Sequence, residues 1–306
     1  MAIFKLKPAC KDYVWGGRRL VDEFGIDGGD ICAEAWMLSA HPDGVSTIVN
    51  GEFAGKTLAD VLKAQPELSG ANSRHFEEFP LLIKFIDAKQ NLSVQVHPPD
   101  DYALAHEGQL GKNEMWYIID AEPNAQLYCG FNRTITRDEF AARIKDNSLV
   151  EVLNAASVRR GDVFYIPAGT IHAVGAGILL AEIQQSSNVS YRVFDYGRNR
   201  PLHIAQALDV TKLTPSDERG KSYPHAAACE DFIVDKLDLD GKFLSRAQGS
   251  IGDETFLSVL ILDGDGEISC GGETLRYRKG DSFFVTAGAG DWEIRGRCDA
   301  LLTTVP

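Results

Sequence analysis

Short segments of β-type sequence, each closed by glycine, proline, asparagine or aspartate, limit what this chain can fold into. The clearest are, in chain order, LLIKFIDA (81–88), LSVQVH (92–97), EMWYIIDA (114–121), AQLYCGF (125–131), DVFYIPA (162–168) and ILLAEIQQ (178–185). Helical signals are fewer. Thr57 is a capping residue ahead of LADVLKAQ, and Thr136 forms a capping box with Glu139. The pattern predicts a mainly β fold, a sandwich or barrel, with a few helical insertions.

A weak internal repeat suggests that this fold occurs twice. RRGDVFYIPAGTIHAV (159–174) returns as YRKGDSFFVTAGAGDWEI (277–294), so that Gly161-Asp162 matches Gly280-Asp281. The alternative is a chance recurrence of "GD, aromatics, AG" in β-rich sequence. We favour two related barrels in tandem, and we predict domains over residues 1–215 and 216–306.

The charge balance excludes some partners. Lys and Arg number 31 against 44 Asp and Glu, a formal net charge of −13, which argues against nucleic acid or an anionic membrane. No stretch approaches the roughly 18 apolar residues of a membrane span, and the start of the chain has no signal-peptide pattern. Six cysteines are scattered singly, which favours reduced thiols. We therefore expect a cytoplasmic protein; monomer and homodimer both stay open.

A set of polar residues on the predicted strands indicates a metal site. Ser93, Gln95 and His97 alternate on one strand and share a face, while Pro98 and Pro99 end that strand. Glu114 and His172 begin other predicted strands. One amide oxygen, one carboxylate and two imidazoles, from Gln95, Glu114, His97 and His172, form a mixed set suited to Zn²⁺. From spacing alone, four unrelated polar residues are an equal alternative.

Several longer strings resemble the type I phosphomannose isomerases, in particular the short bacterial form built of cupin barrels. They are YVWGG, AEAWMLSAHP, LSVQVHP, GKNEMWYI, PAGTIHAVGAG and EIQQSSNVSYRVFDYGR, between about Tyr13 and Arg198. The resemblance implies two tandem cupin-like jelly-roll barrels and interconversion of mannose-6-phosphate and fructose-6-phosphate. It also implies a zinc ion bound by Gln95, His97, Glu114 and His172.

Such an isomerase needs a base near C1 and C2 of the sugar and an electrophile at the oxygens. Lys84 lies on an otherwise apolar strand, and burial would lower its pKa toward that of a useful base; a lysine extending to the strand edge is the alternative. The resemblance places Lys84 in the site. Arg192 offers a planar fork for phosphate or an enediolate.

Further contacts to the substrate are predicted for Ser93, Lys112 and Asn188, although Ser93 and Lys112 could instead be ordinary solvated residues. Many family members carry Asp at the position of Asn188, so this amide cannot serve as a base. That departure puts more weight on Lys84 or a metal-bound water as the base.

We expect one metal per chain, because the second copy of the repeat places Asp291 opposite His172 and Thr286 opposite Pro167. Three alternatives remain at this stage. They are a cupin metalloenzyme acting on another phosphosugar, a cupin dioxygenase, and a non-catalytic cupin that binds sugar phosphate.

Overall fold

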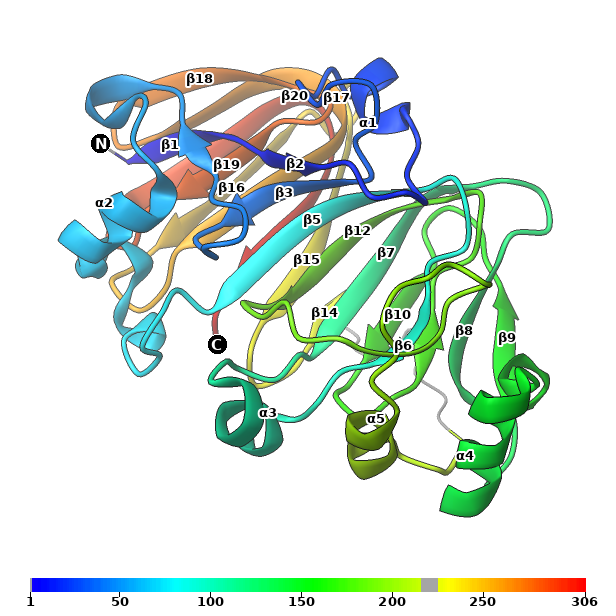
Figure 1. Cartoon of the computed structure of the whole chain (residues 1–306). Helices are drawn as coiled ribbons and strands as arrows, with labels where there is room; N and C mark the ends of the chain where they lie inside the picture. Colours follow the sequence, from blue (N-terminus) through cyan, green and yellow to red (C-terminus); the bar gives the residue numbers. More distant parts are fainter. Residues whose placement is uncertain (1, 216–224) are drawn as a thin grey trace. The chain divides into compact units, whose positions relative to one another are not determined.

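The computed structural model describes residues 2–215 and 225–306, and strands dominate them (Figure 1). The prediction of a mainly β fold with a few helices is therefore confirmed. The described residues form two compact units: unit 1 comprises residues 2–12, 18–85 and 225–306, and unit 2 comprises residues 13–17 and 86–215. The predicted division between residues 215 and 216 borders 216–224, outside the described residues, and stays a prediction.

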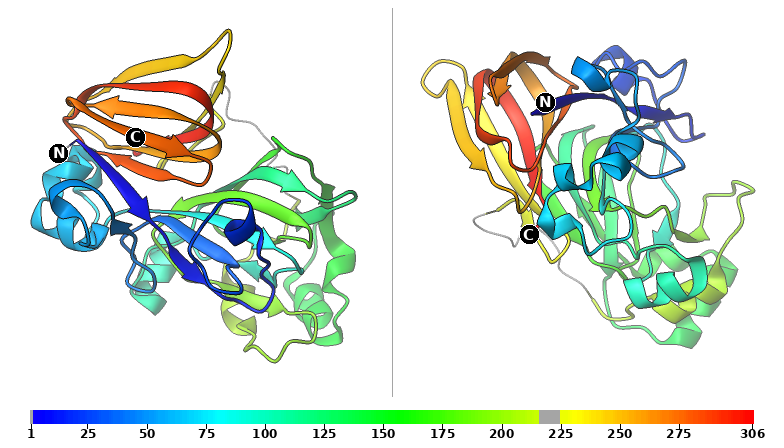
Figure 2. Two further views of the ribbon diagram at one scale, coloured as in Figure 1. Left: turned by 90° about the horizontal axis from the view of Figure 1, so that it is seen from above. Right: turned by 90° about the vertical axis from the view of Figure 1, so that its left-hand side faces the viewer.

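Unit 1 contains a nine-stranded antiparallel sheet in the order β14-β15-β20-β17-β19-β1-β4, with β16 paired to β20 and β18 paired to β17. Its strands are β1 (Ile3–Lys7), β4 (Thr47–Ile48), β14 (Ala227–Ala228), β15 (Ile233–Asp240), β16 (Arg246–Ile251), β17 (Leu257–Cys270), β18 (Glu273–Arg278), β19 (Ser282–Val285) and β20 (Gly290–Thr304). The first strand pairs with β19, so that Phe4 lies opposite Phe284. Figure 2 shows this blue strand beside the orange and red strands.

The same unit holds the antiparallel pair of β2 (Ala9–Lys11) and β3 (Glu34–Ser39), in which Cys10 lies opposite Ala35. Strand β5 (Leu81–Ala88) crosses from unit 1 to unit 2 between Phe85 and Ile86. Two short helices belong to unit 1, α1 (Arg19–Asp22) and α2 (Leu58–Ala64), with 3-10 turns at Gly51–Phe53, Pro66–Ser69 and Ala71–Ser73.

Unit 2 contains two groups of antiparallel strands, β10-β7-β12-β5 and β13-β6-β11-β8-β9. Their bounds are β6 (Val94–Val96), β7 (Glu114–Ala121), β8 (Gln126–Phe131), β9 (Leu153–Ser157), β10 (Val163–Ile166), β11 (His172–Ala173), β12 (Ile178–Gln185) and β13 (Tyr191–Phe194). Helices α3 (Asp100–Glu107), α4 (Arg137–Asp146) and α5 (Ile204–Val210) and a 3-10 turn at Leu149–Val152 lie among them in the chain. Val94 and Val96 join Phe131 and Phe140 in the hydrophobic core.

The internal repeat corresponds to one turn built twice. Gly161 has φ 88° and its N–H donates to Ile118 O at 2.9 Å, while Gly280 has φ 87° and its N–H donates to Ile261 O at 3.0 Å. Each glycine precedes a short strand, β10 in unit 2 and β19 in unit 1. Glycine is favoured at both positions because a side chain is strained at positive φ.

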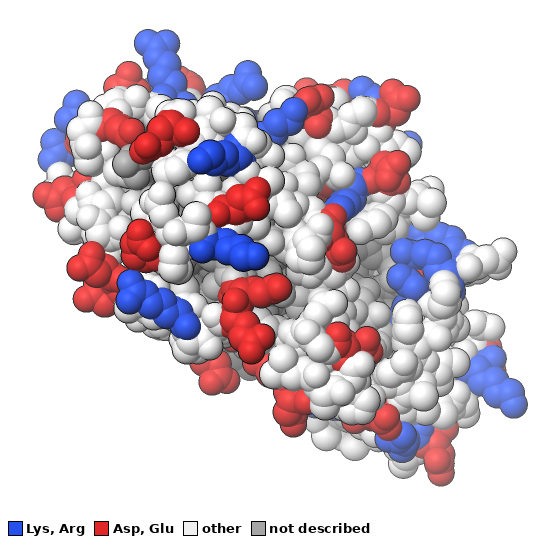
Figure 3. All heavy atoms as spheres, turned by 60° about the vertical axis from the view of Figure 1, so that its left-hand side comes forward, with Lys and Arg blue, Asp and Glu red and all other residues white. Residues whose placement is uncertain are grey.

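Both predicted helix caps are confirmed. Thr57 Oγ1 accepts a hydrogen bond from the N–H of Asp60 at 3.1 Å, and Thr136 Oγ1 accepts one from the N–H of Glu139 at 3.1 Å. None of the helices in residues 2–215 and 225–306 is long and apolar enough to cross a membrane. On the face shown in Figure 3, acidic and basic side chains are mostly interspersed.

Candidate metal centre

The four predicted metal ligands come from three strands of unit 2. Gln95 lies on β6 with His97 directly after it, Glu114 begins β7, and His172 begins β11. Strand β6 pairs with β11 so that Gln95 lies directly opposite His172, and it pairs with β13 so that Arg192 also lies opposite Gln95. Residues directly opposite in antiparallel strands project to the same face. Val94 and Val96 point into the core, so Gln95 projects to the other face, as the alternation predicts. His97 follows β6 directly, before the two prolines.

The two imidazoles and the carboxylate form one buried cluster. Glu114 lies with Oε2 3.5 Å from His97 Nε2 and with Oε1 3.4 Å from His172 Nε2, and the centroids of the two imidazole rings are 4.6 Å apart. One ligand atom from each of the three residues lies within 4.8 Å of the others. All three side chains are almost fully buried. Within the described ranges, this is the only group of three or more His, Cys, Asp or Glu residues with that geometry.

Each imidazole is held in the tautomer that a metal requires. His97 Nδ1 lies 2.9 Å from Val189 O, and His172 Nδ1 lies 2.9 Å from Thr170 O, so in both rings Nδ1 carries the proton and donates it. The Nε2 atoms are buried and make no hydrogen bond. A buried nitrogen without a partner is costly, whereas a backbone carbonyl that orients the opposite ring nitrogen is common behind metal-binding histidines. The donor set therefore fits a divalent metal ion.

The protonation states fit the same role. Burial, reinforced by the positive charge of Lys112, lowers the pKa of His97 to about 3, and burial also lowers the pKa of His172. Burial alone would raise the pKa of Glu114, but Lys112 and the two histidines outweigh it and hold that pKa well below the usual value. At neutral pH the cluster therefore presents two neutral imidazoles and one carboxylate, the forms in which these groups bind metals.

Lys112 links this cluster to a second buried carboxylate. Its Nζ lies 2.8 Å from Glu114 Oε2 and 3.5 Å from Glu182 Oε1, and the lysine side chain is about 5% exposed. Glu182 Oε2 in turn accepts a hydrogen bond from Trp116 Nε1 at 3.0 Å. The burial of its side chain shows that Lys112 is not an ordinary solvated lysine. Its predicted contact with the substrate stays a prediction.

Arg192 lies on β13, beside Gln95 across the strand pair. Its Nη1 donates to Pro201 O at 2.9 Å, and its buried Nε makes no hydrogen bond. Burial lowers the pKa of Arg192, with Arg200 contributing repulsion. A partly buried guanidinium that keeps an unused N–H donor is suited to an anionic group of a ligand.

Three other residues were predicted for the site, namely Ser93, Asn188 and Lys84, and they differ in burial and in their contacts. Ser93 is buried and Asn188 is exposed. Lys84 belongs to unit 1 and is buried, with Nζ 3.6 Å from Glu34 Oε2 and 5.1 Å from the centre of the Trp36 ring. The catalytic role of Lys84 and the ligand role of Gln95 stay predictions.

Sequence reasoning missed two buried residues of β12, Glu182 and Gln184. Gln184 lies opposite Glu114 in the β7–β12 pair, and its buried Oε1 makes no hydrogen bond. Both stand in the apolar string ILLAEIQQ, where polar residues that alternate on a buried strand were the available signal.

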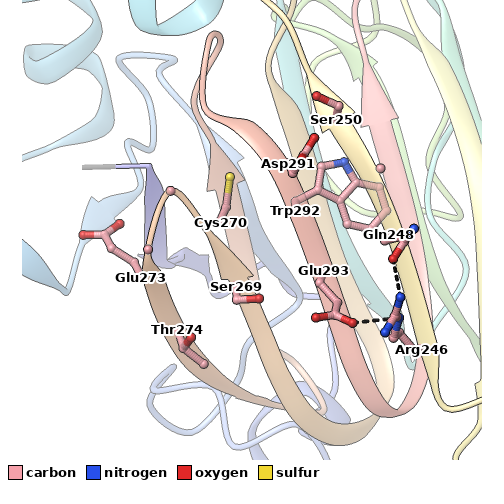
Figure 4. A pocket seen from close by; sticks show the side chains of 13 residues that line it. Arg246, Gln248, Ser250, Ser269, Cys270, Glu273, Thr274, Asp291, Trp292 and Glu293 are labelled. Carbon is pink, nitrogen blue, oxygen red and sulfur yellow. Dashed lines mark hydrogen bonds and ion pairs between the residues drawn. The ribbon is translucent and has the colours of Figure 1, made fainter.

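A separate hollow of about 680 Å³ lies in unit 1, between β16, β18 and the ends of β17 and β20 (Figure 4). On its wall, Arg246 Nε lies 2.8 Å from Glu293 Oε1, and Arg246 Nη2 donates to Gln248 Oε1 at 2.6 Å. Among the described residues that line it, no three His, Cys, Asp or Glu side chains form a cluster of metal-binding geometry.

Comparison with known proteins agrees with this arrangement. A family model for the type I phosphomannose isomerase catalytic domain matches residues 3–128, and one for the mannose-6-phosphate isomerase cupin domain matches residues 223–305. Among curated proteins, the mannose-6-phosphate isomerase of Streptococcus mutans is 37% identical over 94% of this chain and 93% of its own length. The probable mannose-6-phosphate isomerase GmuF of Bacillus subtilis is 37% identical over 97% and 98%.

Among solved structures, the mannose 6-phosphate isomerase from Bacillus subtilis is 34% identical, covers 99% of both chains and superposes with a TM-score of 0.88. Relatives at this identity span nearly the whole chain, and the resemblance expected from the sequence is confirmed. The chain belongs to the type I phosphomannose isomerase family, with its cupin fold.

Proposed function

We propose that this protein interconverts mannose-6-phosphate and fructose-6-phosphate by proton transfer between C1 and C2, with one zinc ion per chain. The observation that carries the proposal is the buried His97, Glu114 and His172 cluster, with both Nε2 atoms unpartnered, in a chain of this family. A mannose 6-phosphate isomerase of the same fold, 17% identical with a TM-score of 0.78, has been solved bound with zinc and yttrium.

His97, Glu114 and His172 would hold the metal, with Gln95 proposed as the fourth ligand. A zinc ion in such a site acts as a Lewis acid toward a sugar oxygen. The remaining steps depend on this chain's own side chains. Arg192 binds an anionic group through its unused N–H. Lys112 lies within 4 Å of the carboxylates of Glu114 and Glu182 and holds Glu114 in its ionised form.

Proton transfer needs a group whose pKa lies near neutral. Lys84 is proposed as the base that accepts the proton, because the family resemblance places it in the site and its side chain is buried on an apolar strand. Ser93, Lys112 and Asn188 are proposed as contacts to the sugar or its phosphate. The scattered free thiols favour a cytoplasmic location.

An assay coupled to fructose-6-phosphate formation tests the proposal. Chelation should abolish turnover of mannose-6-phosphate, added Zn²⁺ should restore it, and metal analysis should find one metal per chain. His97→Ala should lose both metal and activity. Tight binding of mannose-6-phosphate without turnover in the zinc-loaded protein would instead indicate the non-catalytic alternative, and O₂-dependent turnover with iron would indicate a dioxygenase.

Two further variants separate metal binding from the reaction of the sugar. Lys84→Met and Arg192→Met should keep the metal content of the natural protein, while turnover falls by roughly 10²-fold or more. Arg159→Met is the matched control, because Arg159 is almost fully exposed. Normal turnover in Lys84→Met or Arg192→Met would remove that residue from the proposed site.

A further inference from the structure

Two of the six cysteines, distant in sequence, lie side by side in unit 1. Cys10 is on β2, and Cys32 precedes β3, the partner strand of β2. Both sulfur atoms lie 3.0 Å from the point where a Cβ on residue 28 would stand, and only the glycine at that position leaves them room. The thiol of Cys10 donates weakly to Asp27 O at 3.5 Å and interacts with the thiol of Cys32. The structure thus holds a pair of neighbouring thiols.

The two thiols differ in access and in acidity. Cys10 is partly exposed, whereas Cys32 is completely buried and donates weakly to Glu34 O at 3.5 Å. The neighbouring thiol of Cys32 lowers the pKa of Cys10 and outweighs partial burial and the charge of Asp27, which act in the opposite direction. An accessible thiol of lowered pKa beside a second thiol is the arrangement of a cysteine that reacts with oxidants and is then resolved.

Three of the other four cysteines are less accessible than Cys10. Cys129, Cys270 and Cys298 are buried, and burial raises the pKa of Cys270 and of Cys298, the latter to about 11. Cys229 is partly exposed, as Cys10 is, but it contacts Asp231 at 3.8 Å. Cys229 is therefore a matched control for partial exposure.

We propose that Cys10 and Cys32 form a modification site at which a hydroperoxide converts the two thiols reversibly into a disulfide. The thiolate of Cys10 attacks the peroxide, the O–O bond breaks, and Cys10 becomes a sulfenic acid while the peroxide is reduced to an alcohol or water. The sulfur of Cys32 then attacks the sulfur of Cys10. The S–O bond breaks, and hydroxide leaves with the proton of Cys32 as water, so that the pair has lost two electrons in total.

The full chain, reduced and desalted, is treated with a small excess of hydrogen peroxide, alkylated under denaturing conditions and analysed by mass spectrometry. We expect the loss of two alkylatable thiols per chain, a peptide pair cross-linked through Cys10 and Cys32, and recovery of both thiols with dithiothreitol. Cys229→Ser should behave as the natural protein does. Two results would overturn the proposal. One is a cross-link through any other pair of cysteines, and the other is unchanged alkylation of Cys10 and Cys32 when Cys229 is already oxidised.

Single variants test the order of the two steps without relying on the disulfide. Cys32→Ser should stop at the sulfenic acid of Cys10, trapped by dimedone, and Cys10→Ser should leave Cys32 alkylatable. Dimedone labelling of Cys32 in preference to Cys10 would contradict the assigned roles. None of these readouts uses isomerase activity, so the result is independent of the proposed function.

Discussion

Lys112 is the single residue on which the charge balance of the metal centre depends most. It is the buried cation that the structure places within 4 Å of both Glu114 and Glu182. Two carboxylates taken out of water are stable only with compensating positive charge. In the metal-loaded protein the metal supplies part of that charge, whereas in the metal-free protein, in which both imidazoles are neutral, Lys112 must supply it.

We therefore predict that Lys112→Met destabilises the chelated protein by roughly 3 kcal/mol and the zinc-loaded protein by clearly less, because one partner of a buried ion pair is removed. Urea unfolding with chelator and with Zn²⁺ measures the difference. Lys7→Met is the control, since Lys7 forms an exposed pair with Asp27 and should change stability little. Equal losses with and without metal would contradict the assigned role of Lys112.

At the scale of elements, the same turn occurs in both units but under different steric limits. Gly161 and Gly280 share the positive φ, and a Cβ at Gly161 would meet nothing within 4 Å. A Cβ at Gly280 would stand 2.7 Å from the backbone oxygen of Phe24. Backbone cannot move aside as easily as a flexible side chain, so the two turns should tolerate alanine differently.

Gly161→Ala should therefore lower the free energy of unfolding by about 1 kcal/mol, because a side chain at positive φ is strained. Gly280→Ala should lower it by roughly 2–3 kcal/mol in total, because a steric clash adds to that strain. The midpoints of urea unfolding compare the two variants directly. Equal shifts would mean that the contact with Phe24 relaxes without cost.

At the scale of the whole molecule, the buried histidines make the metal-free protein sensitive to acid. An unfolded chain protonates His97 below its ordinary pKa of 6.5, whereas the folded chain does so only near pH 3. Between these values the unfolded state binds more protons, so the free energy of unfolding falls as the pH falls from 6.5 toward 3. Above pH 6.5 the contribution of His97 is complete and constant.

We predict that His97 alone accounts for a loss of about 2 kcal/mol between pH 7 and pH 5 in the chelated protein. Glu114, whose folded pKa is also lowered, adds to the loss at lower pH. Unfolding by urea across this range, compared with His97→Gln, isolates the contribution. A slope with pH that is the same in both proteins would exclude His97 as its source.

The predictions from sequence agree best with the structure where they depend on local patterns. Alternation on residues 92–97, followed by two prolines, correctly placed Val94 and Val96 in the core, although regular strand pairing covers only Val94–Val96. Segments 81–88, 114–121 and 178–185 are strands over their full predicted lengths. The strand predicted at 162–168 ends earlier, at Ile166, because Pro167 has no N–H for the sheet.

The sequence by itself determined the mainly β character, the helix caps, the family and the residue types of the metal cluster, because periodicity, capping and motif spacing are properties of neighbouring residues. Only the tertiary structure decided that β1 pairs with β19, that Lys112 joins Glu114 to Glu182, and that Cys10 meets Cys32. These contacts join residues far apart in the chain. Their register is set by which faces can be buried together, and that choice depends on the packing of the folded chain rather than on any local pattern.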